Sequence, residues 1–282
     1  MITRSGGYLQ PRTLPAPASS TELEQLGYTV QRGIFTAAEV ETLRTEINKT
    51  FAAVPPDRRN ENRTPEGDSM FRYAMLNRSA ACQQAIAHPV ILETIEPLLG
   101  EDCHVIANTA WRNPPRSDGL HGGDAWHIDA GPHVPLPEGV TWPVDIPHPV
   151  FAIGVHIYLQ SCRLSDGPTG VIPGSHLSGR YPPRQESMND YLTYEGRGVV
   201  PLLAEAGDVG FFVSDVWHRR MPTGPGDRGR FFLQVHYGRR DIAQRIYPTA
   251  EVNHLSPDAI ARARSSRQQS VIGLHAPFFY DG

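Results

Sequence analysis

The spacing of apolar residues changes its period about a third of the way along the chain. Before residue 100, one stretch has apolar side chains at every third or fourth position, which is the spacing of one face of a helix. These side chains are Val40, Leu43, Ile47 and Phe51. Thr36 is followed three positions later by Glu39, the pattern of a capping box, so we expect this helix to begin near residue 37.

A strand is expected just before that helix, at residues 28–31, and Gly100 is expected to end a second helical region. Beyond Glu101 the pattern becomes that of short strands, rich in β-branched and aromatic residues and separated by Gly, Pro, Asp or Asn. The runs are HVIANTAW, AWHIDAG, VFAIGVHIYLQ, GVIPGSH, AGDVGFFVSDVWH and RFFLQVHYG. Without helices between them, they indicate an antiparallel sandwich or closed barrel, that is, a mainly β jelly roll with flanking helices.

The same pattern divides the chain into parts. We expect an irregular arm at 1–20 and a single domain at 21–282, with helices at 21–100, a jelly-roll core at about 101–240, and one helix and a tail at 241–282. A polar loop is expected at 55–68 and an insertion between strands at 180–200. The long loops at 112–150 and 180–200, with the tail HAPFFYDG, are expected to cover the mouth of the β scaffold.

Composition narrows the class of protein further. Of the 282 residues, 39% are hydrophobic and 20% charged, as in ordinary globular domains, and the formal charge of −4 favours neither nucleic acid nor an anionic membrane as a partner. The chain contains no apolar run of membrane-spanning length and no secretory h-region. Three scattered cysteines indicate a reducing compartment, so we expect a cytoplasmic protein with a small-molecule partner. The oligomeric state cannot be read from the sequence.

Candidate chemistry lies in the β half. His127 and Asp129 are two residues apart, so in a strand their side chains point to one face. His218 follows 91 residues after His127, at the end of another predicted strand, and Arg228 and Arg230 stand where the next strand begins. Two histidines and a carboxylate occupy one face of a ferrous ion and leave three positions open. A 2-oxo acid can take two of these and dioxygen the third, while an arginine can hold the distal carboxylate of the acid.

Four segments, in order, resemble the phytanoyl-CoA dioxygenase-like family of Fe(II)/2-oxoglutarate-dependent oxygenases. They are LGYTVQRGIFTAAEVETLRTEI, the His127–Asp129 motif, DGPTGVIPGSHLSG and AGDVGFFVSDVWH, within a resemblance that spans roughly residues 25–240. The resemblance implies a double-stranded β-helix core of the cupin type. It also implies a hydroxylase that oxidises a small metabolite with Fe(II), O2 and 2-oxoglutarate and releases succinate and CO2.

Site residues follow from this resemblance one by one. It implies His127, Asp129 and His218 as iron ligands and Arg230, with Arg228 as the alternative, as the partner of the cosubstrate. It also suggests three pocket residues: Thr169, Asn108 and His156. For His156, a core position and a pocket position are both open. Trp126 and Trp217, each next to a predicted ligand, are expected to point away from the metal into packing.

The sequence also departs from the family. Many members carry Gly and Ser directly after the distal histidine, and the serine helps to hold the cosubstrate, whereas here Arg219 and Arg220 follow His218. Some relatives replace the ligand carboxylate with Ala or Gly and halogenate their substrates. Because Asp129 keeps its carboxylate, hydroxylation or a related oxidation is the expected outcome.

Two other classes of protein are alternatives. A cupin-like metalloenzyme that does not use 2-oxoglutarate would call for a His-x-His pair, which the chain lacks. A non-catalytic jelly-roll module that binds a sugar or a protein would need neither the three ligands nor the arginine. The prime substrate stays open between a CoA thioester, an amino acid and a secondary metabolite; loop arginines at 58, 59 and 63 are the only hint of the first.

Overall fold

The structure is a computed structural model that describes residues 2–5, 8–11, 16–54, 70–116, 119–143, 145–244, 246 and 255–275. Its helices are α1 (Ala18–Leu26), α2 (Ala37–Ala53), α4 (Met75–Arg78), α5 (Ala80–Ala85), α6 (Pro89–Leu99), α7 (Pro257–Arg262) and α8 (Ser266–Val271). Its strands are β1 (Ile2–Ser5), β2 (Tyr8–Pro11), β3 (Tyr28–Gln31), β4 (Phe71–Tyr73), β5 (His104–Asn113), β6 (Ala152–Tyr158), β7 (Thr169–Val171), β8 (Val200–Pro201), β9 (Val209–Val213), β10 (His218–Arg220) and β11 (Arg230–Gly238).

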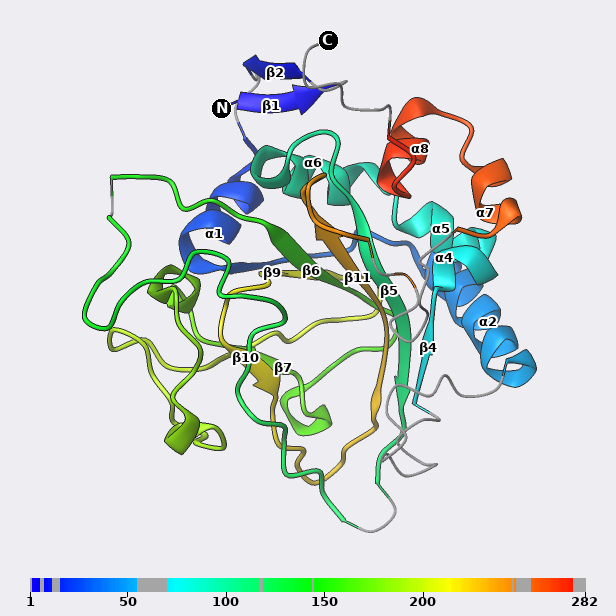
Figure 1. Ribbon diagram of the computed structural model, residues 1–282. Coiled ribbons are helices and arrows are strands. Elements are labelled where there is room, and N and C mark those ends of the chain that lie inside the picture. Colours follow the sequence, from blue (N-terminus) through cyan, green and yellow to red (C-terminus); the bar gives the residue numbers. More distant parts are fainter. Residues whose placement is uncertain are drawn as a thin grey trace.

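The β half consists of a large and a small sheet. The large sheet has the order β3-β9-β6-β11-β5-β4, and the small sheet has the order β10-β7-β8. Every strand pair is antiparallel. Figure 1 shows β10 and β7 in front of the large sheet, with the N-terminal helices around its other side. The predicted mainly antiparallel jelly roll with flanking helices is confirmed.

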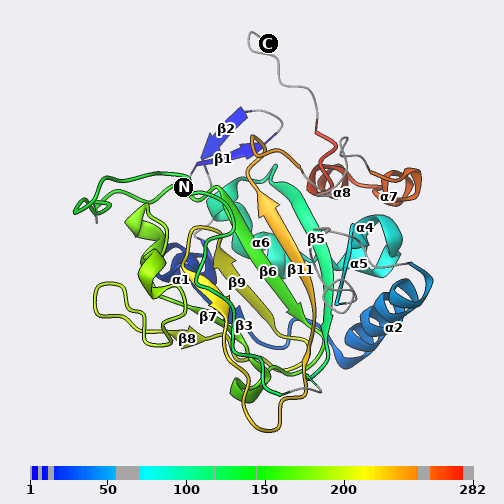
Figure 2. The same ribbon diagram turned by 60° about the horizontal axis from the view of Figure 1, so that its bottom comes forward.

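Alternation along the strands separates the core from the interior of the jelly roll. In β6, Ile153, Val155 and Ile157 belong to the main hydrophobic core, which also contains the apolar faces of α2 and α6. His156 and Tyr158, which alternate with these residues along β6, point to the opposite face because successive side chains of a strand alternate. Figure 2 shows α6 behind β6 and β11, with α2, α4 and α5 on the right beyond β5 and α1 on the left beside β9. One face of the large sheet therefore packs with the helices in the hydrophobic core, and the other face is turned toward the small sheet.

Helix α2 forms as its sequence predicts. The side chain of Thr36 accepts a hydrogen bond from the N–H of Glu39, and the Glu39 carboxylate accepts one from the N–H of Thr36, so the capping box is complete. The predicted apolar face is buried in the core at Val40, Leu43, Ile47 and Phe51. The expected strand at 28–31 and the helix that ends at Gly100 are also present, as β3 and α6.

Two expectations about the chain need correction, and two others concern residues that the structure does not describe. The arm at 1–20 is not irregular throughout, because β1 and β2 pair as an antiparallel hairpin and α1 begins at Ala18. The single C-terminal helix is in fact two, α7 and α8, each started by its own serine N-cap. The predicted loop at 55–68 and the tail beyond His275 lie outside the described residues. None of the described helices has the length and apolar character that crossing a bilayer requires.

Candidate functional site

Two histidines far apart in the sequence face each other across a single β-bridge. The N–H of His127 donates to the carbonyl of His218 over 3.0 Å, and the N–H of His218 donates back to the carbonyl of His127 over 3.0 Å. Residues that are opposed in this way carry their side chains on the same face. The two imidazole rings accordingly lie with their centroids 4.4 Å apart.

Asp129 adds a carboxylate to this pair. Its N–H donates to the carbonyl of Ser214 over 3.0 Å, which keeps the segment after His127 against the turn before His218. Asp129 Oδ1 lies 3.4 Å from His218 Nε2 and 4.0 Å from His127 Nε2. One potential ligand atom from each of these three residues lies within 4.8 Å of the other two, and no other such group occurs in the part of the chain that the structure describes.

Backbone carbonyls set the tautomer of both histidines. His127 Nδ1 lies 2.9 Å from the Ala125 carbonyl oxygen, and His218 Nδ1 lies 2.9 Å from that of Val216. Because a carbonyl oxygen only accepts, Nδ1 carries the proton in each neutral ring and Nε2 presents a lone pair. This is the usual arrangement of a histidine that ligates a metal through Nε2.

The charges of the three groups are strongly linked. Burial raises the pKa of Asp129, but the charges and hydrogen bonds of His218 and His236 outweigh burial and hold this pKa well below its usual value. Burial lowers the pKa of His218, and the Asp129 carboxylate more than compensates, so that this pKa is raised. Burial and the neighbouring His218 lower the pKa of His127. Asp129 is therefore a carboxylate that attracts cations, as an iron ligand must be.

His236, which the sequence analysis missed, contacts the other oxygen of the carboxylate. His236 Nε2 lies 3.2 Å from Asp129 Oδ2, whereas Oδ1 faces the two predicted histidine ligands. Trp111 Nε1 donates to Gln234 Oε1 over 2.6 Å, which turns the Gln234 amide nitrogen toward His236 at 3.1 Å. His236 Nε2 can either accept a hydrogen bond from the Gln234 amide or donate one to the Asp129 carboxylate. The bond to the carboxylate is the stronger because it is charge-assisted. His236 therefore fixes how the Asp129 carboxylate is rotated.

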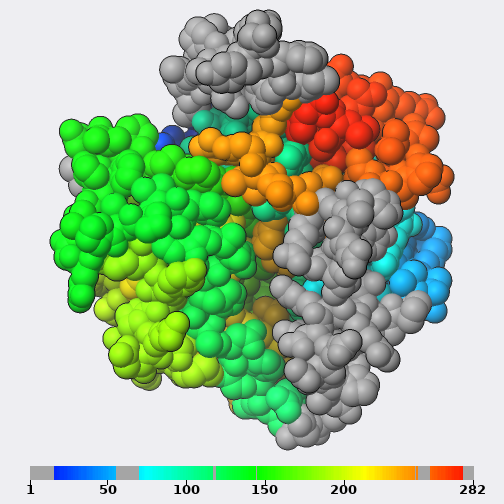
Figure 3. Space-filling model, viewed as in Figure 1, coloured from blue at the N-terminus to red at the C-terminus, as the bar shows by residue number. Residues whose placement is uncertain are grey.

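A cavity of about 620 Å³ adjoins these ligands. Alternate residues of β11 line it, from Arg230 through Phe232 and Gln234 to His236. The signal that could have found Gln234 and His236 was therefore in the sequence, since both alternate with Arg230 along one strand. Figure 3 shows gold atoms of β11 at the bottom of a hollow beside the green loop segment.

Three of the predicted pocket residues line this cavity: Arg230, Thr169 and His156. His156 is buried against the rings of Phe212 and Phe232, and its Nε2 has no hydrogen-bond partner. Burial and the charge of Arg230 hold the pKa of His156 well below its usual value, so its imidazole is neutral. His156 is thus at once a core residue and a lining residue, the two options that the sequence left open.

Among the described residues, no carboxylate forms an ion pair with the partly buried Arg230. Burial, followed by the charge of Arg220, lowers the pKa of Arg230 to about 10. Its Nε has no partner, and its Nη2 makes one long hydrogen bond of 3.4 Å to Asn113 Oδ1. Its guanidinium also lies over the ring of Phe232, 5.4 Å from the centroid. A buried cation that lacks a carboxylate partner is a ready site for an anionic ligand.

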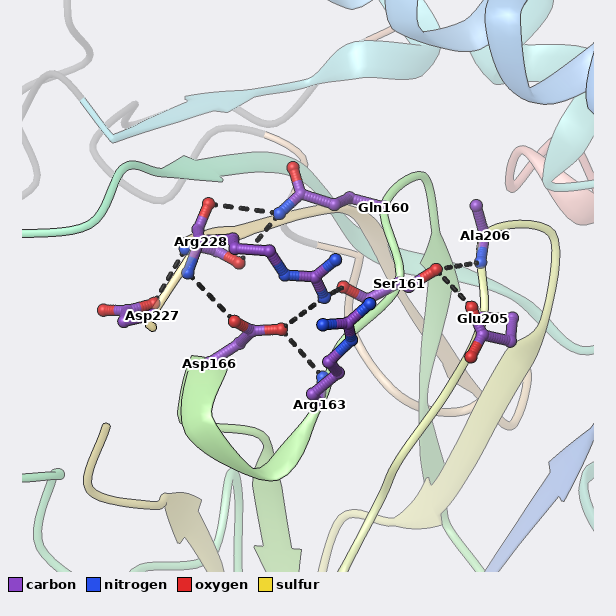
Figure 4. A network of polar contacts seen from close by, with 9 residues as sticks. Gln160, Ser161, Arg163, Asp166, Glu205, Ala206, Asp227 and Arg228 are labelled. Carbon is purple, nitrogen blue, oxygen red and sulfur yellow. Dashed lines mark hydrogen bonds and ion pairs between the residues drawn. The ribbon is translucent and has the colours of Figure 1, made fainter. Parts of the chain in front are cut away.

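Arg228, the alternative to Arg230, is engaged elsewhere. Its Nη2 donates to Asp166 Oδ2 over 2.7 Å and to the Ser161 carbonyl over 3.0 Å, and its backbone N–H donates to Asp166 Oδ1 over 2.9 Å (Figure 4). Arg228 is not among the cavity-lining residues. The geometry therefore favours Arg230 as the cosubstrate partner.

Asn108 lies on the wrong face of its strand to line the cavity. In β5 the lining residues are Ala107, Thr109 and Trp111, so the side chain of Asn108 points to the opposite face. There Asn108 Oδ1 accepts from the N–H of Leu76 over 2.7 Å, and Nδ2 donates to the Gln234 carbonyl over 3.0 Å. Its amide joins α4 to the sheet, and the expectation of a pocket role is corrected accordingly.

Trp126 and Trp217 point into packing, as expected. Both belong to a small hydrophobic cluster that also contains Leu192 and Tyr194 of the insertion at 180–200. Among the described residues that line the cavity, none comes from this insertion, whereas the loop at 112–150 contributes Asp124, Ala125 and Ile128 in addition to the ligands His127 and Asp129. The insertion thus supports the metal-side segments from behind and contributes no described side chain to the cavity wall.

Comparison with known families agrees with this geometry. The family model described as phytanoyl-CoA dioxygenase (PhyH) matches residues 23–227, which is most of the chain. The chain therefore belongs to the phytanoyl-CoA dioxygenase family, as the sequence resemblance predicted, and the predicted enzyme class is confirmed. No curated protein matches the chain in sequence.

Several solved structures are similar in fold. The epimerase SnoN, in complex with Fe3+, alpha ketoglutarate and nogalamycin RO, is 16% identical with a TM-score of 0.61, over 84% of this chain and 91% of that chain. HygX from Streptomyces hygroscopicus, with nickel and 2-oxoglutarate bound, is 17% identical with a TM-score of 0.58, over 82% and 90%. The non-heme monooxygenase ThoJ in its nickel complex is 21% identical with a TM-score of 0.56, over 80% and 79%. These likenesses support the jelly-roll fold.

Proposed function

We propose that the protein is a non-haem Fe(II)/2-oxoglutarate-dependent dioxygenase that hydroxylates, or otherwise oxidises, a small metabolite and releases succinate and CO2. The observation that carries this proposal is the convergence of His127 Nε2, His218 Nε2 and Asp129 Oδ1 beside a cavity that holds Arg230. Two imidazole Nε2 atoms and one carboxylate oxygen that converge in this way are a donor set that suits Fe(II). The residues present therefore fit the cofactor that the family implies.

Each residue has a separate task in this proposal. His127, Asp129 and His218 would hold the metal, and the carbonyls of Ala125 and Val216 keep the two imidazoles in the ligating tautomer. Arg230 would receive the distal carboxylate of 2-oxoglutarate through charge-assisted hydrogen bonds. When bound, the iron supplies the redox chemistry by which O2 is reduced and 2-oxoglutarate is decarboxylated. The protein contributes positioning and the exclusion of water around this centre.

The remaining cavity wall indicates the kind of prime substrate. Thr109, Trp111 and Gln234 also line the cavity and offer an aromatic surface with a few polar atoms. Such a lining and a volume of about 620 Å³ are typical of sites for small organic molecules. We propose a small metabolite as substrate and, because Cys82, Cys103 and Cys162 are all unpaired thiols, a reducing cytoplasmic environment.

The test is anaerobic titration of the purified protein with Fe(II) and 2-oxoglutarate, followed by admission of O2 and measurement of succinate. We expect a weak visible charge-transfer band in the wild type that is absent in Asp129→Ala, and O2-dependent succinate only in the wild type. A folded wild-type protein that binds Fe(II) but shows neither band nor succinate would instead support a cupin-like metalloenzyme that does not use 2-oxoglutarate. A folded protein without metal affinity would support a binding module.

A further inference from the structure

A second arginine shares the cavity with Arg230. Arg220 lies two residues after His218 on β10, so its side chain points to the same face as that of His218, and it lines the same cavity. On the neighbouring strand its Cα is paired with that of Thr169, another lining residue. Arg220 and Arg230 therefore approach one cavity from the small and the large sheet, respectively.

Both guanidinium groups have hydrogen-bonding capacity that the protein does not use. The Nε atoms of Arg220 and Arg230 are buried and have no partner. Within the described part of the chain, neither group forms an ion pair with a carboxylate, and the side chain of Arg220 donates no hydrogen bond. Because desolvated N–H groups cost free energy when they are unpaired, two such arginines in one cavity point to a ligand that supplies acceptors.

The charge around the two arginines is also unbalanced. Asp124 is the acidic residue of the cavity wall on this side, but its side chain is 56% exposed and lies 3.8 Å from His121 Nε2. Asp227 lies in the turn before β11, and its carboxylate accepts from the backbone N–H of Gly229. Two like charges that are close together in a partly desolvated space repel each other, so an anion between them would be bound strongly.

We infer that Arg220 and Arg230 together form a two-cation site for the distal carboxylate of a 2-oxo dicarboxylic acid. Arg220 is then a second cosubstrate-binding residue, at the position where the family pattern has a serine. Two guanidiniums offer a carboxylate more charge-assisted hydrogen bonds than one arginine and one hydroxyl can. The site should therefore select strongly for 2-oxo acids that carry a distal carboxylate over those that lack one. This inference rests on the proposed function for the identity of the ligand, but its test does not require turnover.

The test uses metal-free protein in the presence of a chelator, with glutarate as the probe. Glutarate has the distal carboxylate but no 2-oxo group, so its binding does not depend on a metal. We expect Arg220→Ser to weaken glutarate binding in calorimetry by about ten- to a hundredfold, the range for a lost hydrogen bond to a charged group. Arg220→Lys keeps the charge but not the planar guanidinium, so its affinity for glutarate should lie between those of the wild type and Arg220→Ser. Arg184→Ser removes an exposed arginine that does not line the cavity, and this variant should bind glutarate as the wild type does.

Thermal unfolding without ligand separates a binding role from a structural one. Removing one of two like charges should leave the melting temperature of Arg220→Ser unchanged or higher, whereas loss of a structural arginine would lower it. The inference is overturned if the wild type does not bind glutarate, if Arg220→Ser binds it equally well, or if that variant is destabilised in proportion to its loss of binding. A protein that passes these tests but produces no succinate would retain the two-cation site and lose the proposed function.

Discussion

Two arginines that stand two residues apart, Arg228 and Arg230, show how this chain separates stability from binding. Arg228 is 38% exposed and donates to the fully buried Asp166, which also accepts from the backbone N–H groups of Arg163 and Arg228. Arg230 lines the cavity and has one long hydrogen bond and an unpaired Nε. The first arrangement is satisfied within the protein, whereas the second leaves N–H groups that the proposed cosubstrate would use.

The difference begins with the turn between the two residues. Gly229 has φ +77, a left-handed conformation that favours glycine, and a Cβ at this position would lie 2.2 Å from the Asn113 carbonyl oxygen. This turn directs Arg228 outward to the loop around Asp166, while Arg230 begins β11 and follows its alternation into the cavity. We call the satisfied contacts among Arg228, Asp166 and the backbone the closed network. Contacts of this kind stabilise a fold, whereas unsatisfied polar groups such as the Nε of Arg230 indicate a binding site.

The largest effect on stability is expected at the closed network. Asp166→Asn removes the charge that pairs with Arg228 and leaves fewer acceptors for the two backbone N–H groups, so the free energy of unfolding should fall by about 3 kcal/mol. Urea denaturation measures this change. Glutarate affinity of the folded protein should remain that of the wild type. A variant that is fully stable but unable to bind glutarate would reverse the comparison.

A matched pair of variants should separate the two arginines. Arg230→Met should weaken glutarate and 2-oxoglutarate binding by about ten- to a hundredfold, because it removes the charge-assisted contacts to a carboxylate. Its melting temperature should not fall, since Arg230 makes only one long hydrogen bond to a described residue. Arg228→Met should show the opposite result, a lower melting temperature with normal cosubstrate affinity. Calorimetry and thermal unfolding on both variants check the prediction, and equal behaviour of the two would contradict it.

His236 provides a third test within the site. Because its ring holds Oδ2 of Asp129, His236→Ala should weaken metal affinity by about ten- to a hundredfold, the range for partners that orient a ligand. His236→Gln retains a donor and should recover part of the loss. Competition with a chromophoric chelator measures affinity, and the visible spectrum of the Co(II) form reports ligand geometry. An unchanged spectrum and affinity in His236→Ala would remove His236 from this role.

The smallest expected effect is a pH dependence that belongs to the closed network. Burial raises the pKa of Asp166, but the hydrogen bonds from Arg228 and the backbone outweigh burial, so its folded-state pKa lies below the ordinary value. The resulting stability is present above the unfolded-state pKa of about 3.9 and is lost as the pH falls through the folded-state pKa. Wild-type stability should therefore fall more steeply than that of Asp166→Asn in this acidic range. Parallel slopes in urea titrations would contradict the assignment.

The sequence predicted the parts of the site that depend on local order. The two-residue spacing of His127 and Asp129 and the later strand that ends in His218 made these residues candidates, and the family resemblance then implied them, with Arg230, as the four residues that the structure brings together. Asn108 was misplaced because the face of a strand depends on its register with β11, and no local pattern gives that register. The pairing of Arg228 with Asp166 is also long-range and could not be read from the sequence.

The central claim is that His127, Asp129 and His218 hold the metal while Arg230 holds the distal carboxylate of 2-oxoglutarate. Its most direct test is a crystal structure of the protein prepared anaerobically with Fe(II) and 2-oxoglutarate, with anomalous scattering recorded at the iron edge. The account predicts one strong peak in contact with Nε2 of both histidines and with Asp129 Oδ1, and a bound 2-oxoglutarate that reaches Arg230. An iron peak elsewhere, or a cosubstrate whose distal carboxylate contacts neither arginine of the cavity, would contradict it.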